Sequence, residues 1–252
     1  MEKFFIKNRL GLKICVLVEN SGASKLAFVE HGLGGTKESV TIAGMRETLV
    51  NNDFCTVSFD ASNSFGESEG KIEDITLTSH YNDLEDVISW AESQKLYKEK
   101  FFLAGHSMGA ATTFYYNTNY PDKVSGVFPA SLFLGGEFTD CYRRFTLPEF
   151  KKNGYVERIG SNGIKRRITK DFRNDVLKYD ILENSDNIQN PVLMMVMSGD
   201  TGTPLKNHKL VYNKLKTKDK KLVVIEGEGH VFKGEHNNSM KKEFDKFLKQ
   251  YF

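Results

Sequence analysis

Short runs of apolar residues alternate along the chain with longer stretches in which apolar residues recur every three or four positions. The short runs, rich in Val, Leu, Ile and Phe, predict buried strands, and the longer spacing predicts helices with one apolar face. Strands that alternate with helices are typical of a mainly parallel sheet covered on both faces. The pattern therefore predicts an α/β fold.

The sheet is expected to have eight strands. The first two form an antiparallel hairpin at one edge, because the strand-like residues 3–7 and 12–18 flank a turn-forming Asn-Arg-Leu-Gly stretch. Six further strands are expected at residues 26–30, 55–60, 101–104, 125–128, 192–197 and 222–226. Apolar residues spaced three and four apart predict two helices that pack on this sheet, over residues 77–91 and 240–251.

One long polar segment interrupts the alternation. Residues 134–190 separate two consecutive strands and contain Gly-Gly and Gly-Ser-Asn-Gly stretches. A structureless connection of this length is unusual in a compact domain, so we expect an inserted cap with helices of its own, placed to serve as a lid. Residues 1–133 and 191–252 then form the core of the fold.

The composition is that of one globular domain that needs no cross-links. The 252 residues are 39% hydrophobic and 27% charged, enough to bury a sizeable core. Cys15, Cys55 and Cys141 are odd in number, far apart and without a Cys-x-x-Cys spacing, which argues against a zinc site or a disulfide framework. We therefore expect a cytoplasmic protein without a metal or organic cofactor.

Charge and hydropathy argue against other classes of protein. A formal net charge of +2 is too small to indicate a nucleic-acid partner. No apolar run approaches the length of a membrane span, and Lys7, Arg9 and Lys13 interrupt the N-terminal apolar residues where a signal peptide needs an unbroken run. The sequence leaves the oligomeric state open, with a homodimer as one option.

The clearest chemical motif is Gly-His-Ser-Met-Gly at residues 105–109. It follows an expected strand and precedes a helical stretch, which is the context of a nucleophile elbow, a strained turn that lifts a serine hydroxyl clear of the sheet. Glycines are expected on either side because side chains there would collide with the neighbouring strand and helix. The pattern alone is not specific, but its placement makes Ser107 the candidate nucleophile.

A serine hydroxyl needs a base, and the base needs a third group to orient it. His230 follows the last expected strand, in a loop that would deliver it to the edge of the sheet that carries Ser107, so it is the expected base. The other histidines fit less well: His31 opens a glycine-rich turn, His106 lies within the elbow, His80 lies on a helix, and His208 and His236 are expected to be solvated on surface helices.

The acid should lie between Ser107 and His230 in the chain, because this is the order in folds built around such an elbow. Asp200 follows the strand expected at residues 192–197 and is the favoured candidate, although an aspartate beside glycines is also common in simple turns. Glu137 and Asp140, which follow the preceding strand, are the competing positions.

A second glycine-rich turn, His-Gly-Leu-Gly-Gly at residues 31–35, follows the first parallel strand. Small residues there allow backbone N–H groups to approach a substrate oxygen, and we expect Leu33 and Met108 to donate from the backbone to an oxyanion. Such a turn could instead hold a phosphate, but it has neither a Walker lysine nor a Gly-x-Gly-x-x-Gly pattern.

With these motifs the chain resembles the α/β-hydrolase superfamily over nearly its whole length, and within it the bacterial cinnamoyl (feruloyl) esterases and the monoacylglycerol-lipase-like group. The matching motifs are the His-Gly turn, a Gly-x-Ser-x-Gly loop at residues 66–70, the elbow, and a Gly-x-x-His-x-Phe ending at residues 227–232. The resemblance implies the α/β-hydrolase fold, with a mostly parallel eight-stranded sheet and an inserted cap.

Two positions depart from that group. Its acid motif, Gly-Asp-x-Asp-x-x-Val-Pro, corresponds to Met-Ser-Gly-Asp-Thr-Gly-Thr-Pro at residues 197–204, and an ungapped alignment puts Asp200 on the catalytic second aspartate. Phe65 stands where the group commonly has histidine, which would reshape the wall of the pocket.

These residues predict a serine hydrolase that cleaves a small-molecule carboxylic ester through an acyl-enzyme on Ser107. Thioesters and carbon–carbon substrates are alternatives on the same site, and a non-catalytic ligand-binding module of the same fold is an alternative of a different class. Lys and Arg are frequent between residues 137 and 175, where they would attract acidic substrates, although a solvated helical surface explains the same charges.

Overall fold

The main sheet contains all eight strands expected from the sequence. The computed structural model describes residues 1–136, 148–159 and 163–252. The sheet has the strand order β1-β2-β4-β3-β5-β6-β9-β10. Its members are β1 (Glu2–Lys7), β2 (Lys13–Glu19), β3 (Lys25–Glu30), β4 (Phe54–Asp60), β5 (Phe101–His106), β6 (Val124–Ala130), β9 (Val192–Gly199) and β10 (Lys220–Glu228).

The direction of the strands follows the prediction. β1 and β2 form an antiparallel hairpin, and β2 also runs antiparallel to β4. From β4 to β10 every neighbouring pair is parallel. The carboxyl ends of β5, β9 and β10 therefore lie at the same edge of the sheet, where ligands bind in open α/β sheets.

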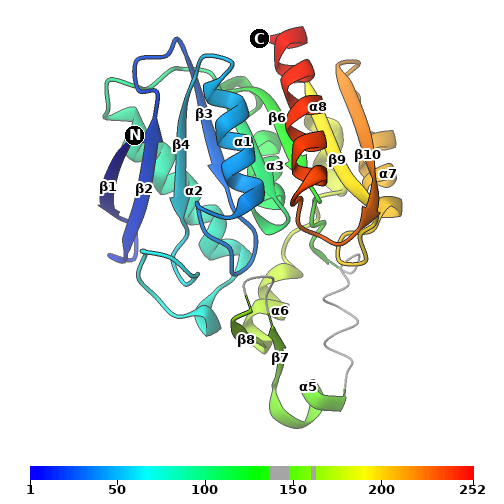
Figure 1. Cartoon of the computed structure of the whole chain (residues 1–252). Coiled ribbons are helices and arrows are strands. Elements are labelled where there is room, and N and C mark those ends of the chain that lie inside the picture. The colour runs from blue at the N-terminus through cyan, green and yellow to red at the C-terminus, as the bar shows by residue number, and fades with distance from the viewer. Residues whose placement is uncertain (137–147, 160–162) are drawn as a thin grey trace.

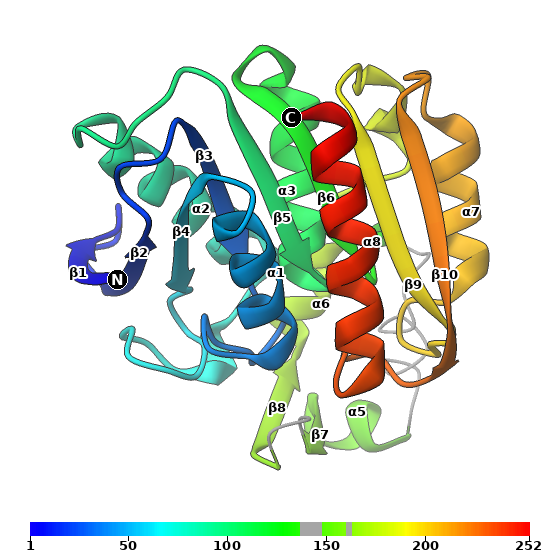
Figure 2. The same ribbon diagram turned by 45° about the horizontal axis from the view of Figure 1, so that its top comes forward.

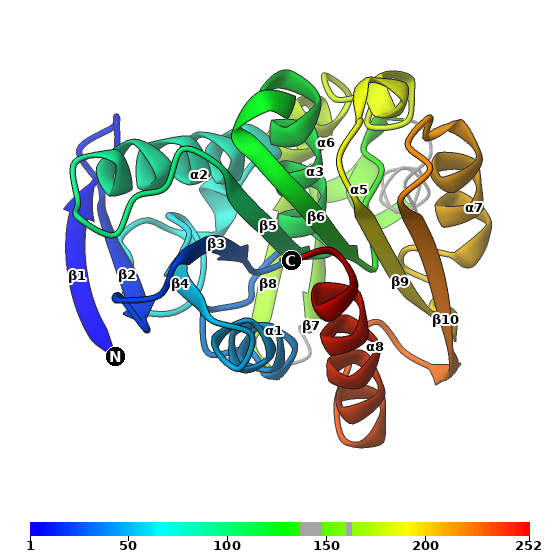
Figure 3. The same cartoon turned by 90° about the horizontal axis from the view of Figure 1, so that it is seen from above.

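Helices cover both faces of this sheet. Figure 3 shows α1 and α8 on one face and α2, α3 and α7 on the other, and in Figure 2 α1 and α8 lie side by side in front of the strands. Their bounds are α1 (Val40–Val50), α2 (Leu77–Glu92), α3 (Met108–Asn119), α7 (Leu205–Lys214) and α8 (Glu235–Tyr251). The apolar stripes predicted for α2 and α8 are confirmed, since Leu84 and Ile88 and likewise Met240 and Phe244 are buried.

None of the helices in the described ranges combines the length and the apolar character needed to cross a lipid bilayer.

Alternation along the central strand β5 explains why the core has two halves. Phe101 and Leu103 belong to the apolar cluster on one face of the sheet, and Phe102 and Ala104 to the cluster on the other. Side chains of successive strand residues point to opposite faces, so an unbroken apolar run serves both. Complete burial of each large side chain contributes about 1.5–3 kcal/mol, and this anchors the strand that leads into the elbow.

The segment between β6 and β9 contains strands as well as the helices expected there. It includes α5 (Pro148–Asn153), β7 (Tyr155–Ile159), β8 (Lys165–Thr169) and α6 (Lys170–Val176), and it lies beyond one end of the main sheet (Figure 1). β7 and β8 form an antiparallel pair in which Val156 faces Ile168. Val156 and Ile168 are buried, while the residues beside them are mostly charged and more exposed. The apolar pattern is therefore too short and too polar for these two strands to be predicted from the sequence.

This arrangement corrects one expectation about the basic residues of the segment. Arg158, Lys165, Arg166 and Arg167 lie on strands, so they do not belong to a helical surface. Arg143 and Arg144 lie outside the described residues. The role of residues 134–190 as a cap stays a prediction.

Candidate active site

Ser107 occupies a strained turn between β5 and α3. Its φ angle is +57°, a left-handed conformation that is unusual for a residue with a side chain, and α3 begins at the next residue. The backbone N–H of Ser107 donates to the Ala130 carbonyl at 2.9 Å, which ties the turn to β6. At Gly109, a Cβ atom would lie 2.4 Å from the Glu30 carbonyl oxygen, so only glycine allows the helix to start this close to β3.

His230 lies in the loop after β10 and faces the serine. Its Nε2 atom is 2.7 Å from the Ser107 Oγ atom, and its Nδ1 atom is 2.8 Å from an Asp200 carboxylate oxygen. The imidazole side chain is 34% exposed, so its outer edge can meet a substrate. With Nδ1–H donated to the carboxylate, Nε2 is left to accept the serine proton.

Asp200 follows β9 and is fully buried at its carboxylate. One oxygen accepts the backbone N–H groups of Gly202 at 2.8 Å and Thr203 at 3.0 Å, while the other accepts the Thr203 hydroxyl at 2.8 Å and His230. Burial would raise the pKa of Asp200, but these hydrogen bonds and the His230 imidazole lower it to about 2. Asp200 therefore bonds the backbone of its own turn and contacts His230 at the same time, so the two interpretations of this residue from the sequence do not exclude each other.

His106, which lies within the elbow beside Ser107, holds the backbone of His230. Its Nε2 atom is 2.8 Å from the His230 carbonyl oxygen, and the two rings lie 4.8 Å apart between centroids. Burial, together with the neighbouring His230, lowers the pKa of His106 to about 3, so the ring is neutral. His106 therefore fixes the loop that carries His230.

The turn at residues 31–35 approaches Ser107 closely. A Cβ atom on Gly32 would lie 2.9 Å from the Ser107 Cβ atom. His31 Nδ1 donates to the Gly32 carbonyl at 2.8 Å, and His31 Nε2 accepts the Ala61 N–H at 3.0 Å. Because a trans peptide carries its C=O and N–H on opposite sides, this contact turns the N–H of Leu33 away from His31.

Met108 is the first residue of α3. The first N–H groups of a helix have no acceptor inside the helix, and they lie at its positive end. Leu33 and Met108 both line the pocket that contains Ser107. Both predicted oxyanion donors therefore belong to residues that line this pocket, and their role stays a proposal.

A buried network of hydrogen-bonded side chains adjoins the turn at residues 31–35. Glu30 and His80 are fully buried, with a Glu30 carboxyl oxygen 3.1 Å from His80 Nδ1, and the Thr112 hydroxyl donates to the second carboxyl oxygen. Burial raises the pKa of Glu30 and lowers the pKa of His80, so it favours the uncharged form of each group. This network joins β3 to α2 and α3 just below the elbow.

The pocket in front of Ser107 has a volume of about 310 Å³. Its lining is mainly apolar or glycine, with hydroxyl groups from the Asp200 loop and one arginine: Gly32, Leu33, Gly34, Gly35, Ser39, Thr41, Ile42, His106, Ser107, Met108, Phe133, Arg166, Phe172, Thr201, Gly202, Thr203, His230 and Val231. Phe65 packs beside Gly34, so it affects the wall of the pocket indirectly, by contacting the turn at residues 31–35.

The other histidines and acids considered in the sequence have different outcomes. His208 is buried, which makes the expectation of a solvated surface histidine wrong: its Nε2 atom accepts the Leu132 N–H at 2.8 Å. His236 is half-buried at the start of α8. Glu137 and Asp140, the competing acids, lie outside the described residues, as does Cys141.

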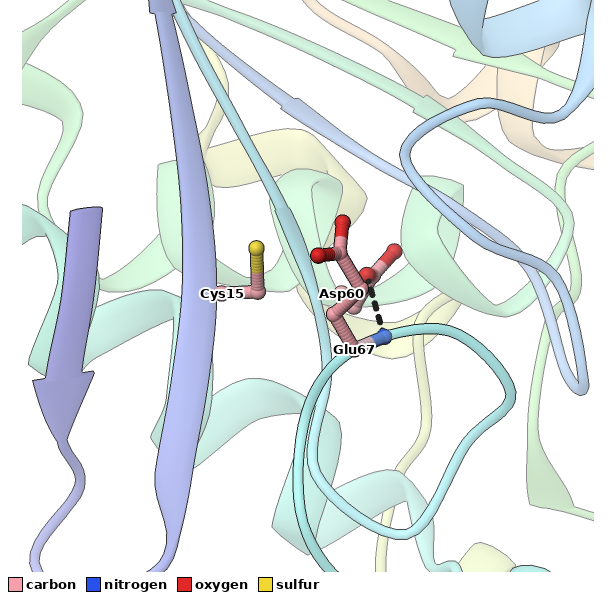
Figure 4. A group of neighbouring side chains, drawn as sticks. All are labelled: Cys15, Asp60 and Glu67. Atoms are coloured by element: carbon pink, nitrogen blue, oxygen red, sulfur yellow. Dashed lines mark hydrogen bonds between the residues drawn. The ribbon is translucent and has the colours of Figure 1, made fainter. Parts of the chain in front are cut away.

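A second cluster of reactive side chain types lies near the β1–β2 edge (Figure 4). One ligand atom from each of Cys15, Asp60 and Glu67 lies within 4.8 Å of the others, a grouping that could suit a metal ion. The Lys37 ammonium group, however, lies 2.7 Å from an Asp60 oxygen and 2.9 Å from a Glu67 oxygen. Lys37 thus forms a buried ion pair with Asp60, and the more exposed Glu67 is shared between Lys37 and Lys3.

Comparisons with known proteins identify the architecture. A family model described as "alpha/beta hydrolase fold" matches residues 28–131, and one described as a TAP-like protein matches residues 175–251. Est1E from Butyrivibrio proteoclasticus with ferulic acid bound is similar, with a TM-score of 0.82 and 21% identity over 98% of each chain.

Two further solved structures are similar along their whole length. Mouse alpha/beta hydrolase domain-containing protein 10 has a TM-score of 0.80 and 15% identity over 99% of each chain. A monoacylglycerol lipase from Paleococcus ferrophilus has a TM-score of 0.73 and 20% identity over 100% of each chain. No curated protein sequence matches this chain. At identities this low, the similarity establishes the fold.

Proposed function

The chain has the α/β-hydrolase fold that its motifs predict, and on this premise we propose that it is a serine hydrolase that cleaves carboxylic esters. Ser107 is the nucleophile, His230 the general base and Asp200 the residue that orients it. The observation that carries the proposal is the pair of contacts at 2.7 Å and 2.8 Å that joins these three side chains beside an open pocket. Nucleophile, base and orienting acid in hydrogen-bond contact are the requirement for acyl transfer.

In the proposed reaction the Ser107 oxygen attacks the ester carbonyl carbon while its proton passes to His230 Nε2. The carbonyl oxygen gains the negative charge, which the backbone N–H groups of Leu33 and Met108 stabilise. Collapse of this intermediate breaks the bond to the alcohol oxygen, which takes the proton from His230 and leaves. Water then attacks the acyl-enzyme by the same route, releasing the acid and restoring Ser107.

The pocket indicates what part of a substrate is recognised. Aromatic and aliphatic side chains, including Phe133, Phe172 and Ile42, form much of its lining. A volume of about 310 Å³ suits a small or medium-sized apolar group next to the scissile bond. The names of two structural neighbours, one with ferulic acid bound and one a monoacylglycerol lipase, support esters as the class to test first.

Labelling with a fluorophosphonate tests the proposal. The probe should modify the wild-type protein once, at Ser107, while Ser107→Ala should be unlabelled and should lose hydrolysis of p-nitrophenyl acetate and butyrate by roughly 10⁴–10⁶-fold. Ser198→Ala is the matched control, because Ser198 is exposed but hydrogen-bonds to Glu226 and has no histidine partner. A wild-type protein that is neither labelled nor active would support the non-catalytic alternative and overturn the proposal.

A further inference from the structure

Arg166 connects the segment predicted to be the cap with the oxyanion turn. It lies on β8, 133 residues from Leu33 in the chain, yet it lines the same pocket as Ser107. Its Nη1 atom donates to the Leu33 carbonyl oxygen at 2.6 Å. The guanidinium also packs on Gly34, where an added Cβ would lie 2.4 Å from Nη1. A charged donor makes this hydrogen bond stronger than one between neutral groups.

This contact completes the restraint on the Leu33 backbone. The peptide before Leu33 is held through the Gly32 carbonyl, which accepts His31 Nδ1 at 2.8 Å and the Gly35 N–H at 2.9 Å. The peptide after Leu33 is held by Arg166. The Leu33 N–H belongs to the first of these peptide planes, which the core fixes. Arg166 on β8 fixes the second plane, so Leu33 is not free to rotate about the backbone bonds between the two.

We infer that Arg166 is a positioning residue, through which the predicted cap holds the Leu33 N–H in place for the oxyanion. The inference rests on the proposed function, because it assigns Arg166 a role in that same site. Donors must lie within a few tenths of an ångström of their ideal position to stabilise a transition state. Loss of Arg166 therefore lowers the rate of the chemical step more than it weakens ground-state binding of the ester.

The neighbouring residue on β8 provides a matched control. Side chains of successive strand residues point to opposite faces, and Arg167 contacts Glu157 at 3.2 Å and lies over the Tyr155 ring at 4.7 Å. Arg167→Gln removes the same charge from the same strand without touching the Leu33 carbonyl. Arg166→Lys keeps a cationic donor and tests whether the hydrogen bond is what matters.

The experiment compares Arg166→Gln, Arg166→Lys and Arg167→Gln with wild type on p-nitrophenyl butyrate, with thermal unfolding as a check on folding. Arg166→Gln should lower kcat about tenfold or more with KM changed less than about twofold, and should weaken inhibition by phenylboronic acid by a similar factor, because the tetrahedral boronate mimics the transition state. Arg166→Lys should recover part of the loss, and Arg167→Gln should match wild type.

Each outcome decides a different point. Equal kcat values for Arg166→Gln and Arg167→Gln, or a higher KM at unchanged kcat, would overturn the positioning role while leaving the proposed function intact. A wild-type protein that resists fluorophosphonate and hydrolyses no ester would overturn the proposed function and this inference with it. If Arg166→Gln does not fold, Arg166→Met, which keeps an unbranched apolar side chain but has no donor, takes its place: a lower kcat beside an unchanged Arg167→Gln supports the inference, and an unchanged kcat overturns it.

Discussion

Two clusters on the same sheet contain similar chemical groups but differ in what they can do. One joins Ser107, His230 and Asp200 at the carboxyl ends of β5, β9 and β10. The other joins Lys37 to Asp60 on β4, with Cys15 of β2 beside them. Each contains a serine or cysteine, a nitrogen-bearing side chain and a buried aspartate, so residue types alone do not distinguish the proposed reactive site from a structural cluster.

The nitrogen group makes the difference. Burial opposes a charge on Lys37, but Asp60 and Glu67 outweigh it and raise the pKa of Lys37 above its ordinary value, so the amine stays protonated and cannot accept a proton. Burial likewise raises the pKa of the Cys15 thiol. An imidazole, by contrast, can exchange protons near neutral pH. Ser107 and His230 lie beside an open pocket with a group that can accept a proton, whereas the buried carboxylate of Asp60 is already paired with a protonated amine.

The largest effect is expected from removing the charge of the triad aspartate. Asp200→Asn should lower kcat/KM about 10³–10⁴-fold, because an amide favours the wrong histidine tautomer and cannot stabilise imidazolium. Kinetics on p-nitrophenyl butyrate measure this, with circular dichroism to confirm folding. Asp186→Asn, which alters an aspartate paired with Lys216 at the surface, should remain at the wild-type level. Full activity of Asp200→Asn would mean that another residue orients His230.

Substitutions in the Lys37 cluster should lower the stability of the protein and leave its ester hydrolysis nearly unchanged. Lys37→Met leaves the buried Asp60 carboxylate without its cation and should lower the free energy of unfolding by about 3–5 kcal/mol, measured by urea denaturation. Lys3→Met breaks an exposed pair with the same Glu67 and should cost less than about 1 kcal/mol. The comparison fails if folded Lys37→Met loses ester hydrolysis by more than tenfold, since the cluster would then belong to the reacting site.

The same contrast explains what could be predicted from the sequence. All eight strands were identified because each is a short apolar run between turn signals, and Ser107 and His230 stand directly after such runs. The packing of His208 against the Leu132 N–H has no local signal. The contact between Arg166 and the Leu33 carbonyl has no local signal in the sequence either, because β7 and β8 have only one buried residue each. Contacts between distant segments depend on tertiary structure, which residue spacing does not encode.

His208 provides a pH test that separates packing from catalysis. Burial lowers its pKa to about 4 from the ordinary 6.5, so the native ring stays neutral while the unfolded chain takes up a proton between these values. Stability should therefore fall as the pH falls from about 6.5 to about 4. His208→Gln should reduce the loss in unfolding free energy between pH 7.5 and 5 by up to about 2 kcal/mol.

Urea unfolding at the two pH values measures the effect of His208→Gln. His236→Gln, at a half-buried position on α8, is the control and should keep the wild-type pH response. If both variants lose as much unfolding free energy between pH 7.5 and 5 as wild type does, protonation of His208 does not cause the loss of stability in acid.

The smallest effect concerns a hydroxyl that supports the triad. The Thr203 Oγ1 atom donates to the Asp200 oxygen that also contacts His230, at 2.8 Å. Thr203→Val removes this donor at nearly constant volume, so the carboxylate loses one of the hydrogen bonds that keep its pKa at about 2. We expect kcat to fall about five- to tenfold, equivalent to roughly 1–1.4 kcal/mol. Thr203→Ser should restore the rate because it restores the hydroxyl. A loss in Thr203→Ser together with wild-type activity of Thr203→Val would assign the effect to the methyl contact, and the hydroxyl would then not be needed to hold the aspartate.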